Sequence, residues 1–349
     1  MTQKPLKPIT LKELSSRLEL SQSTVSRIVN GEADKYRIAR ETQQRVLQAA
    51  ALYGYTANTV ARSLRKKRSF TVGVIVPEIS EGYSTAVIGG IEDELLKDGF
   101  FYFVVSHRHR PDLLKGYPRM LLARSVEGIV AVDTPIEEDL PIPLVSVSGH
   151  RHRAGVINIE LDHGQAAYLA LSHLQELGHR EIAFIKGQAF SSDTNRRWHA
   201  IVAQAKSLGV TIHPELVVQL QGTEPGPGPG TEVTWRLLQA GRPFSALFAF
   251  NDVTAMGAIM ALREAGLRVP KDVSVVGFDD VLAASTYNPP LTTIRQPLRD
   301  MGQVAASTLL GLIGNQIPHP HPADITVYPK LVVRKSTAQA ATHPDGKGH

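Results

Sequence analysis

Apolar residues recur at helical spacing three times in the first 55 positions of the chain. The first repeat is Leu11, Leu14 and Leu18, which would lie together on one face of a helix. Thr10 and Glu13 form a capping-box pattern at its start, and that pattern marks the point where a helix begins. We therefore predict a short first helix that begins directly after Thr10.

A second short helix is predicted to follow after three or four residues. Ser21 is a suitable N-cap, because its hydroxyl can accept a hydrogen bond from a free backbone N–H one turn on. Val25, Ile28 and Val29 then face a small core. Asn30 and Gly31 tolerate a left-handed backbone and end the helix. This arrangement turns a polar, singly basic set of side chains outward, namely Gln22, Ser23, Ser26, Arg27 and Asn30.

A third helix is predicted from Arg40 to Tyr53, ended by Gly54. Its apolar stripe is predicted to comprise Val46, Leu47, Ala50 and Leu52. The sequence then changes character, with a two-turn helix predicted from Asn58 to Leu64 and a basic run at 65–68. A helix this short is marginal alone, so we expect it to become ordered only when something docks on it.

From Phe70 onward, short apolar runs alternate with amphipathic segments. Strands are predicted in two series, at 71–76, 101–105, 128–132 and 143–148, and at 181–185, 216–220, 246–250 and 273–278. Helices are predicted between them at 86–97, 117–124, 164–177, 194–208, 231–240 and 253–265. Such alternation is typical of an α/β fold with doubly wound parallel sheets. The two series predict two similar lobes with a cleft between them.

The end of the chain adds a predicted helix at 298–313 and a strand at 326–333. The segment EPGPGPG at 224–230 is predicted to be a loop, because it is rich in Pro and Gly. We divide the chain into a helical headpiece (1–56), a hinge helix with linker (57–69), a core (70–336) and a disordered tail (337–349). Within the core, the first lobe is assigned 70–160 and 296–324, and the second lobe 161–295 and 325–336.

The charge of the chain is divided unevenly. Residues 1–68 hold 14 Lys and Arg against 5 Asp and Glu, whereas the remaining residues hold 24 against 28. A small basic module on a mildly acidic body is suited to binding phosphates by counterion release. The alternative is a basic segment that only aids solubility, and the two capped helices argue against it.

Composition excludes several other classes of protein. The chain has no cysteine, which excludes disulfides, thiolate catalysis and zinc held by cysteine. No run of about 18 apolar residues and no apolar signal core is found. We therefore expect a cytoplasmic protein that does not enter a membrane.

The paired helices at the N-terminus suggest DNA binding. A tight helix pair whose second member presents Gln, Ser and Arg near its start suits the major groove, where Arg reads guanine and Gln or Asn reads adenine. An ordinary helical hairpin with a solvated face is the alternative.

Several motifs together resemble one family, the LacI/GalR transcriptional repressors. They are STVSRIVNG, ANTVARSL, GIVAV, ELGHREIAFI, FAFNDVTAMGAI, REAGLRVPKDVSVVGFDD and PPLTTIRQP, and they extend from Thr10 to Ser336. The resemblance implies a helix-turn-helix headpiece, a hinge helix and a periplasmic-binding-protein-like core. It also implies a homodimer that binds a pseudopalindromic operator in double-stranded DNA, with no cofactor and no metal.

The resemblance also assigns roles to residues. DNA contacts are assigned to Ser21, Gln22, Ser23, Thr24, Ser26, Arg27 and Asn30 of the second helix, and to Asn58, Ala61 and Leu64 of the hinge. Leu64 matches the leucine that wedges into a minor-groove step. Effector contacts are assigned to Tyr83, His107, Ser148, Arg197, Asn251 and Asp279. Asn251 and Asp279 directly follow apolar strands, where ligands bind in such sheets.

Several positions depart from the family pattern. Glu81, Gly82, Tyr83 and Ser84 stand where Asn-Pro and aromatic residues are usual, Ser148-Gly149 replaces the usual Asp-Arg, and Ala39 replaces a common capping Ser. HRHR also occurs twice, at 107–110 and 150–153. These segments could form a basic rim that favours an acidic sugar such as a uronate or a sugar phosphate. A solvated loop face and, more remotely, a metal site are the alternatives.

We expect a DNA-binding transcriptional regulator that acts as a repressor. Its affinity for the operator should depend on a small molecule, a sugar or sugar derivative, that binds between the lobes. A solute-binding protein without a regulatory role is the alternative. An enzyme is not expected, because no GxGxxG, Walker loop or GxSxG motif is present.

Overall fold

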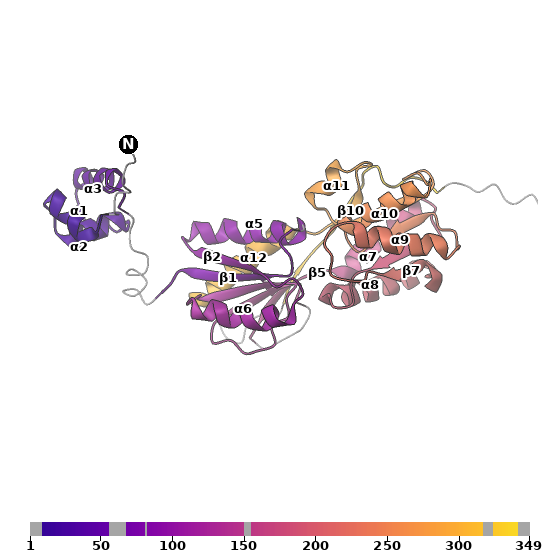
Figure 1. Ribbon diagram of the computed structural model, residues 1–349, viewed down its shortest axis with the longest axis horizontal. Coiled ribbons are helices and arrows are strands. Elements are labelled where there is room, and N and C mark those ends of the chain that lie inside the picture. Colours follow the sequence, from indigo (N-terminus) through magenta and orange to yellow (C-terminus); the bar gives the residue numbers. More distant parts are fainter. Residues whose placement is uncertain (1–8, 56–67, 81, 150–154, 317–323, 341–349) are drawn as a thin grey trace, which may run out of the picture. The chain divides into compact units, whose positions relative to one another are not determined.

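The computed structural model describes residues 9–55, 68–80, 82–149, 155–316 and 324–340. The chain forms two compact units, residues 1–69 and residues 70–349, and Figure 1 shows the elements of each. The predicted hinge helix, with Asn58, Ala61 and Leu64, lies outside the described residues. Within the described ranges, no helix is long and apolar enough to cross a membrane.

The first unit contains the three predicted helices: α1 (Leu11–Leu18), α2 (Gln22–Val29) and α3 (Arg40–Leu52). The capping box is confirmed, since the backbone N–H of Thr10 donates to the Glu13 carboxylate at 2.7 Å and the backbone N–H of Glu13 donates to the Thr10 hydroxyl at 3.2 Å. Ser21 caps α2 as predicted by accepting from the backbone N–H of Thr24 at 3.1 Å. Gly31 and Gly54 have left-handed φ angles directly after α2 and α3.

The core of this unit is narrower than the sequence indicates. Its buried members come from all three helices, and they include Leu14, Leu18, Val25, Ile28, Val46 and Ala50. Two members of the predicted stripe are exposed, Leu47 by 51% and Leu52 by 77%. Val46 and Ala50 are one helical turn apart and face the small core. Leu47 and Leu52 are one and two positions further along the helix, respectively, so their side chains point away from that core. The prediction for Leu47 and Leu52 was wrong.

The second unit contains two six-stranded sheets. The first sheet has the strand order β11-β5-β4-β3-β1-β2 and is parallel throughout. Its strands are β1 (Thr71–Val76), β2 (Phe101–Ser106), β3 (Gly128–Val132), β4 (Leu144–Val147), β5 (Ile157–Leu161) and β11 (Ile325–Val327). Helices α5 (Gly82–Lys97) and α12 (Leu298–Ile313) pack together on one face, and α6 (Pro111–Ala123) covers the other.

The second sheet has the order β12-β10-β9-β8-β6-β7, and only the β10 to β12 pair is antiparallel. Its strands are β6 (Ile182–Lys186), β7 (Val217–Gln219), β8 (Ala246–Phe248), β9 (Ser274–Asp279), β10 (Thr292–Arg295) and β12 (Lys330–Val332). Its helices are α7 (His163–Glu176), α8 (Ser192–Leu208), η1 (Pro214–Leu216), α9 (Gly228–Gln239), α10 (Asp252–Glu264) and α11 (Leu282–Thr286). The predicted α/β class with two doubly wound parallel sheets is confirmed.

The two lobes are joined by chain crossings that the sequence pattern did not reveal. The strand predicted at 326–333 is two strands, β11 in the first sheet and β12 in the second. Pro329 lies between them and cannot donate a ladder hydrogen bond. Residues 325–327 therefore belong to the first lobe, and their assignment to the second was wrong.

Two further predictions need correction. Helix α9 begins at Gly228, so the end of the 224–230 segment is helical, because Pro is tolerated in a first turn. Residues 337–340, predicted to be disordered, lie along the second lobe. The backbone N–H of Ala338 donates to the Ser274 hydroxyl at 3.0 Å, and the N–H of Ala340 donates to the carbonyl of Leu177 at 2.8 Å.

Candidate functional site

A cavity of about 110 Å³ lies between the two lobes at the carboxyl ends of their strands. The first lobe contributes Pro77, Tyr83, Arg108, His109 and Asp133, which follow or adjoin β1, β2 and β3. The second lobe contributes segments that follow β6, β7, β8 and β9. This is the edge at which doubly wound sheets bind ligands.

Arg197 is the most constrained polar side chain of the cavity. It is 4% exposed, and its guanidinium lies 3.6 Å from the centre of the Phe278 ring. One Nη donates to the carbonyl of Phe250, and the other donates to Asp193 at 3.2 Å. Its Nε has no hydrogen-bond partner among the described residues. A buried donor without a partner is costly, so it indicates a place where a ligand can accept a hydrogen bond.

Asn251 lies where β8 leads into α10. Its side-chain oxygen accepts from the backbone N–H of Thr254 at 2.8 Å and caps α10. This cap fixes the side chain at the cavity wall, while its NH₂ group remains a donor. Its neighbour Asp252 is fully buried away from the cavity, where it accepts from the Thr293 hydroxyl at 2.6 Å.

Asp279 closes β9 with a left-handed φ of 108° and is 6% exposed. Gln296 donates to its Oδ1 at 2.6 Å. Burial raises the pKa of Asp279 well above its usual value, although Arg197 opposes that rise. The adjacent Asp280 instead forms ion pairs with Arg295 and Arg334 at 2.6 Å each. The cavity thus contains Asn251 and Asp279, the first residues of the Asn-Asp and Asp-Asp pairs, whereas Asp252 and Asp280 do not line it.

Tyr83 lines the cavity from the start of α5, and its hydroxyl donates to Ser148 at 3.1 Å. Burial raises the pKa of Tyr83 well above its usual value, and the nearby carboxylates of Asp193 and Asp133 raise it further. The tyrosine therefore remains a neutral hydroxyl. Ser148 does not line the cavity itself, and its hydroxyl accepts the hydrogen bond from Tyr83.

His107 does not line this cavity, although it lines a larger one that adjoins it. It is 3% exposed, and its Nε2 lies 3.2 Å from the Thr134 hydroxyl. Its Nδ1 accepts from the backbone N–H of His109 at 3.1 Å. Burial lowers the pKa of His107 to about 4, so the ring is neutral. His107 thereby fixes the turn that brings its neighbours Arg108 and His109 to the cavity.

The first HRHR segment therefore does not form the basic rim that its composition suggested. Burial lowers the pKa of His109, and Arg110 is paired with Asp112 at 2.6 Å. Of the residues in this segment, only Arg108 places a permanent positive charge at the cavity wall. The second HRHR segment, 150–153, lies outside the described residues.

The sequence analysis missed several residues of the cavity. Asp193 lies one turn before Arg197 on α8 and forms an ion pair with it. Side chains four residues apart on a helix are neighbours, so this spacing could have identified Asp193 from the sequence. Asp133 directly follows β3, as Asn251 follows β8. The aromatic walls, Phe190 and Phe250, carry no such signal.

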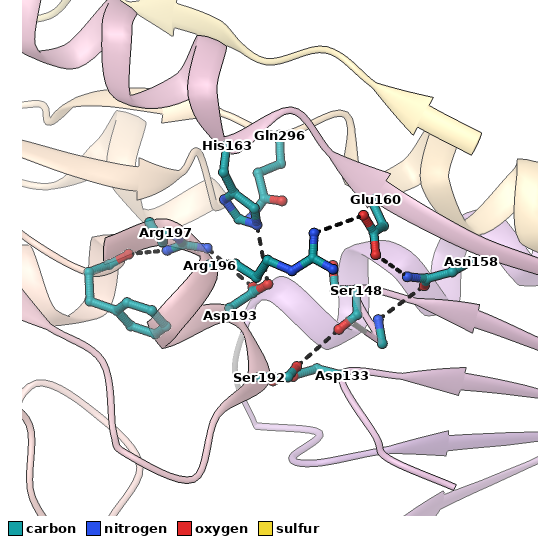
Figure 2. A network of polar contacts seen from close by, with 12 residues as sticks. Asp133, Ser148, Asn158, Glu160, His163, Ser192, Asp193, Arg196, Arg197 and Gln296 are labelled. Atoms are coloured by element: carbon teal, nitrogen blue, oxygen red, sulfur yellow. Dashed lines mark hydrogen bonds and ion pairs between the residues drawn. The ribbon is translucent and has the colours of Figure 1, made fainter. Parts of the chain in front are cut away.

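Polar contacts beside the cavity join the two lobes, as Figure 2 shows. The Ser192 hydroxyl, at the start of α8, donates to Asp133 at 2.6 Å and lies 3.0 Å from the carbonyl of Ser148. Arg196 lies 3.5 Å from Glu160 on β5. Within the second lobe, His163 lies 3.5 Å from Asp193. Helix α8 thus carries both the cavity residues and the contacts between the lobes.

In the first unit, α2 presents the predicted polar face. Ser21, Gln22 and Ser23 are exposed at its start, and the Ser21 hydroxyl lies 2.8 Å from those of Ser23 and Thr24. The Asn30 amide donates to the carbonyl of Ser26 at 2.7 Å, so it is used within its own helix.

Arg27 is half-buried rather than fully extended into solvent. Its guanidinium lies 3.8 Å from the centre of the Tyr36 ring, in the loop after α2. Cation–π contacts of this kind hold an arginine in one place without consuming its donors. The arginine is therefore positioned beside the polar start of α2.

A short helix pair with an exposed polar face, followed in the chain by a two-lobed unit with an internal cavity, is typical of DNA-binding regulators that respond to a small molecule. The chain is 33% identical over 341 residues to the HTH-type transcriptional repressor PurR of Haemophilus influenzae, covering 94% of this chain and 98% of that protein. Residues 171–337 match the family described as periplasmic binding protein-like domain.

Solved structures of transcriptional regulators are similar to this chain as well. A Lac repressor dimer bound to operator and the anti-inducer ONPF has a TM-score of 0.81 at 27% identity, covering 95% of this chain and 100% of that chain. The complex of the transcriptional regulator CelR with cellobiose has a TM-score of 0.70 at 25% identity, covering 94% and 99%. The chain belongs to the LacI/GalR family of helix-turn-helix transcriptional regulators. It is a DNA-binding repressor and not an enzyme.

Proposed function

We propose that this repressor binds a neutral carbohydrate in the cavity between its lobes and that this effector changes its affinity for operator DNA. The observation that carries the proposal is the convergence of Arg197, Asn251 and Asp279 on one cavity. A forked donor, an amide and a carboxyl group match the alternating donors and acceptors of sugar hydroxyls. Phe190 and Phe250 add apolar walls for the C–H faces of a sugar ring.

A neutral effector is favoured over the acidic one that the sequence suggested. The cavity is lined by five acidic side chains, Glu78, Asp133, Asp193, Glu224 and Asp279, against two arginines, Arg108 and Arg197. Arg197 already donates to Asp193. A carboxylate or phosphate on the effector would meet several like charges here, which disfavours its binding.

Two of the similar solved structures contain a sugar. The CelR structure contains cellobiose, and a family member from Enterococcus faecium, 26% identical to this chain, was solved with bound ribose. We therefore assign effector contacts to Tyr83, Arg197, Asn251 and Asp279, with Ser148 and His107 as supports.

We further propose that the DNA contacts are made by α2 and by the hinge residues Asn58, Ala61 and Leu64, and that the protein works as a homodimer in the cytoplasm. A dimer places two headpieces on two half-sites of a pseudopalindrome. The Lac repressor to which this chain is similar is a dimer bound to operator. Gln22 and Ser23 are exposed at the start of α2, where base edges are read.

Selection of operators from a randomised pseudopalindromic DNA pool tests the DNA side of the proposal. Substituting Gln22 and Ser23 by Ala should change the selected sequence. Arg27→Ala should reduce the slope of log affinity against log salt by about one if it contacts phosphate. Arg268→Ala, which removes the same charge from the core, is the control and should leave the slope unchanged. Unchanged operator choice and an unchanged slope in the α2 variants would overturn this assignment.

A further inference from the structure

A second cavity, of about 560 Å³, adjoins the effector cavity. The two have five lining residues in common, His109, Asp133, Phe190, Ser191 and Thr223. Pockets that hold drug-sized ligands span about 300 to 1,000 Å³. The volume of the inner cavity, about 110 Å³, is below this range. The volume of the outer cavity, about 560 Å³, falls inside the range.

The boundary between the two cavities is formed by one ring from each lobe. The rings of His109 and Phe190 have centres 4.3 Å apart and are tilted by 44°. Phe190 is 49% exposed, so part of its face remains open to a ligand. His107 fixes this boundary, because its Nδ1 accepts from the backbone N–H of His109.

Helix α8 serves both cavities. Its Asp193 and Arg197 face the inner cavity, while Asn195, Arg196 and His199 line the outer one. Asn195 and His199 are four residues apart, so they lie on one face of the helix. Within the described part of the chain, neither of these two side chains forms a hydrogen bond. Both are therefore available to a ligand.

The outer cavity is suited to uncharged hydroxyl groups. His107 is neutral, and burial also lowers the pKa of His109. The charge of Arg196 is paired with that of Glu160 at 3.5 Å. The ring of His109 and the amide of Asn195 can donate to and accept from hydroxyls, and the open face of Phe190 can pack against the C–H face of a sugar ring.

We infer that the two cavities form one site for a two-ring glycoside of disaccharide size. One ring is held by Arg197, Asn251 and Asp279, the glycosidic link passes the His109 and Phe190 rings, and the second ring is bound by Asn195 and His199. This inference rests on the proposed carbohydrate effector and adds its size and a second subsite.

Thermal shift followed by calorimetry on the full-length protein tests the inference with matched probes: glucose with cellobiose, galactose with lactose, and xylose with xylobiose. One disaccharide should bind at least about tenfold more tightly than its monosaccharide, the equivalent of one or two hydrogen bonds. Asn195→Ala and His199→Ala should remove that advantage and leave monosaccharide binding unchanged. Lys206→Ala, exposed on the same helix, is the control.

The outcomes separate the two levels of the proposal. If a monosaccharide binds as tightly as its disaccharide and the His199 variant behaves like the Lys206 variant, the outer subsite is wrong while the carbohydrate effector stands. If none of the six sugars binds, the carbohydrate effector itself is overturned, and the second subsite with it.

Discussion

The side chain of Val281, in the second lobe, packs directly against Gly82 of the first lobe. It fills the space that a side chain at position 82 would need. A Cβ at Gly82 would lie 2.9 Å from both the Cβ and the Cγ1 of Val281, closer than real Cβ contacts allow. Gly82 begins α5 and precedes Tyr83 in the cavity, while Val281 follows Asp279 and Asp280. The two lobes therefore meet directly beside the cavity.

Gly82→Ala should push the lobes apart at this contact. Overpacking of this kind typically costs about 1 to 3 kcal/mol, and the effector site should be affected because Tyr83 is the next residue. We expect weaker effector binding by about tenfold, measured by calorimetry, with a cooperative thermal transition retained.

Gly116→Ala is the matched control. Gly116 lies within α6, and nothing lies within 4 Å of a Cβ built there. Alanine should stabilise the helix by about 0.5 to 1 kcal/mol and leave effector affinity unchanged. Equal behaviour of the two variants would show that the Gly82 contact does not control the spacing of the lobes.

Asp252 is predicted to make stability fall as pH rises. Burial raises the pKa of Asp252 to about 7, although Thr293 and the backbone N–H of Val281 donate to it. Because the folded state binds this proton more tightly than the unfolded state, the stabilisation present at low pH is lost as pH rises through the folded pKa. The loss can reach about 1.4 kcal/mol per pH unit between pH 5 and 7.

Asp252→Asn should remove this dependence, because the Thr293 hydroxyl can rotate to accept from the new amide. Urea unfolding at several pH values measures the difference between the variant and the unmodified protein. Asp272→Asn is the control of opposite sign, because Arg268 lowers the pKa of Asp272 to about 2. The stability difference it causes should be constant above about pH 4 and should shrink only as pH falls below that value. A constant difference between the Asp252 variant and the unmodified protein from pH 5 to 7.5 would argue against a titrating Asp252.

The segment 336–340 is predicted to stabilise the second lobe. The Ser336 hydroxyl accepts from the backbone N–H of Thr292 at 2.8 Å and donates to the carbonyl of Val275 at 2.6 Å. His179, 2% exposed, has its Nε2 3.0 Å from the carbonyl of Ala338. Truncation after Lys335 leaves buried strand groups without partners, at about 1 to 3 kcal/mol each.

We expect that truncation to lower the free energy of unfolding by about 3 kcal/mol or more, measured in urea. Truncation after Ala340 keeps every contact of this segment and should change stability by less than about 0.5 kcal/mol. Two truncations with the same stability would contradict the role of the segment.

The sequence predicted strands with continuous apolar runs, such as β1 and β3, because strands buried on both faces carry that pattern. It missed β5 and β10, whose short sequences INIEL and TTIR mix polar and apolar residues at the crossings between lobes. Residues 337–340 were missed for a related reason, since backbone and hydroxyl hydrogen bonds hold them rather than a periodic apolar face.

The site was predictable where chemistry follows from position in the chain. Asn251 and Asp279 could be assigned because they end apolar strands, and Arg197 through the family resemblance. The placement of His107 could not be predicted, because its side chain turns away from the cavity to bond Thr134 and the backbone of His109. Asp133 and Asp193 come from different lobes and line the same cavity only in the folded structure, so their roles could not be predicted from the sequence.

Coupling between the cavity and the headpiece is the central claim, and fluorescence anisotropy with a labelled operator tests it most directly. The operator selected in vitro is titrated with the protein, with and without the sugar that stabilises it, for the unmodified chain and for Arg197→Lys, which keeps the charge but loses the forked geometry. The sugar should change operator affinity by roughly 5- to 150-fold in the unmodified protein and leave the variant's unchanged, while both bind operator equally without sugar. An equal sugar response in both proteins, or no response in the unmodified one, would contradict the account.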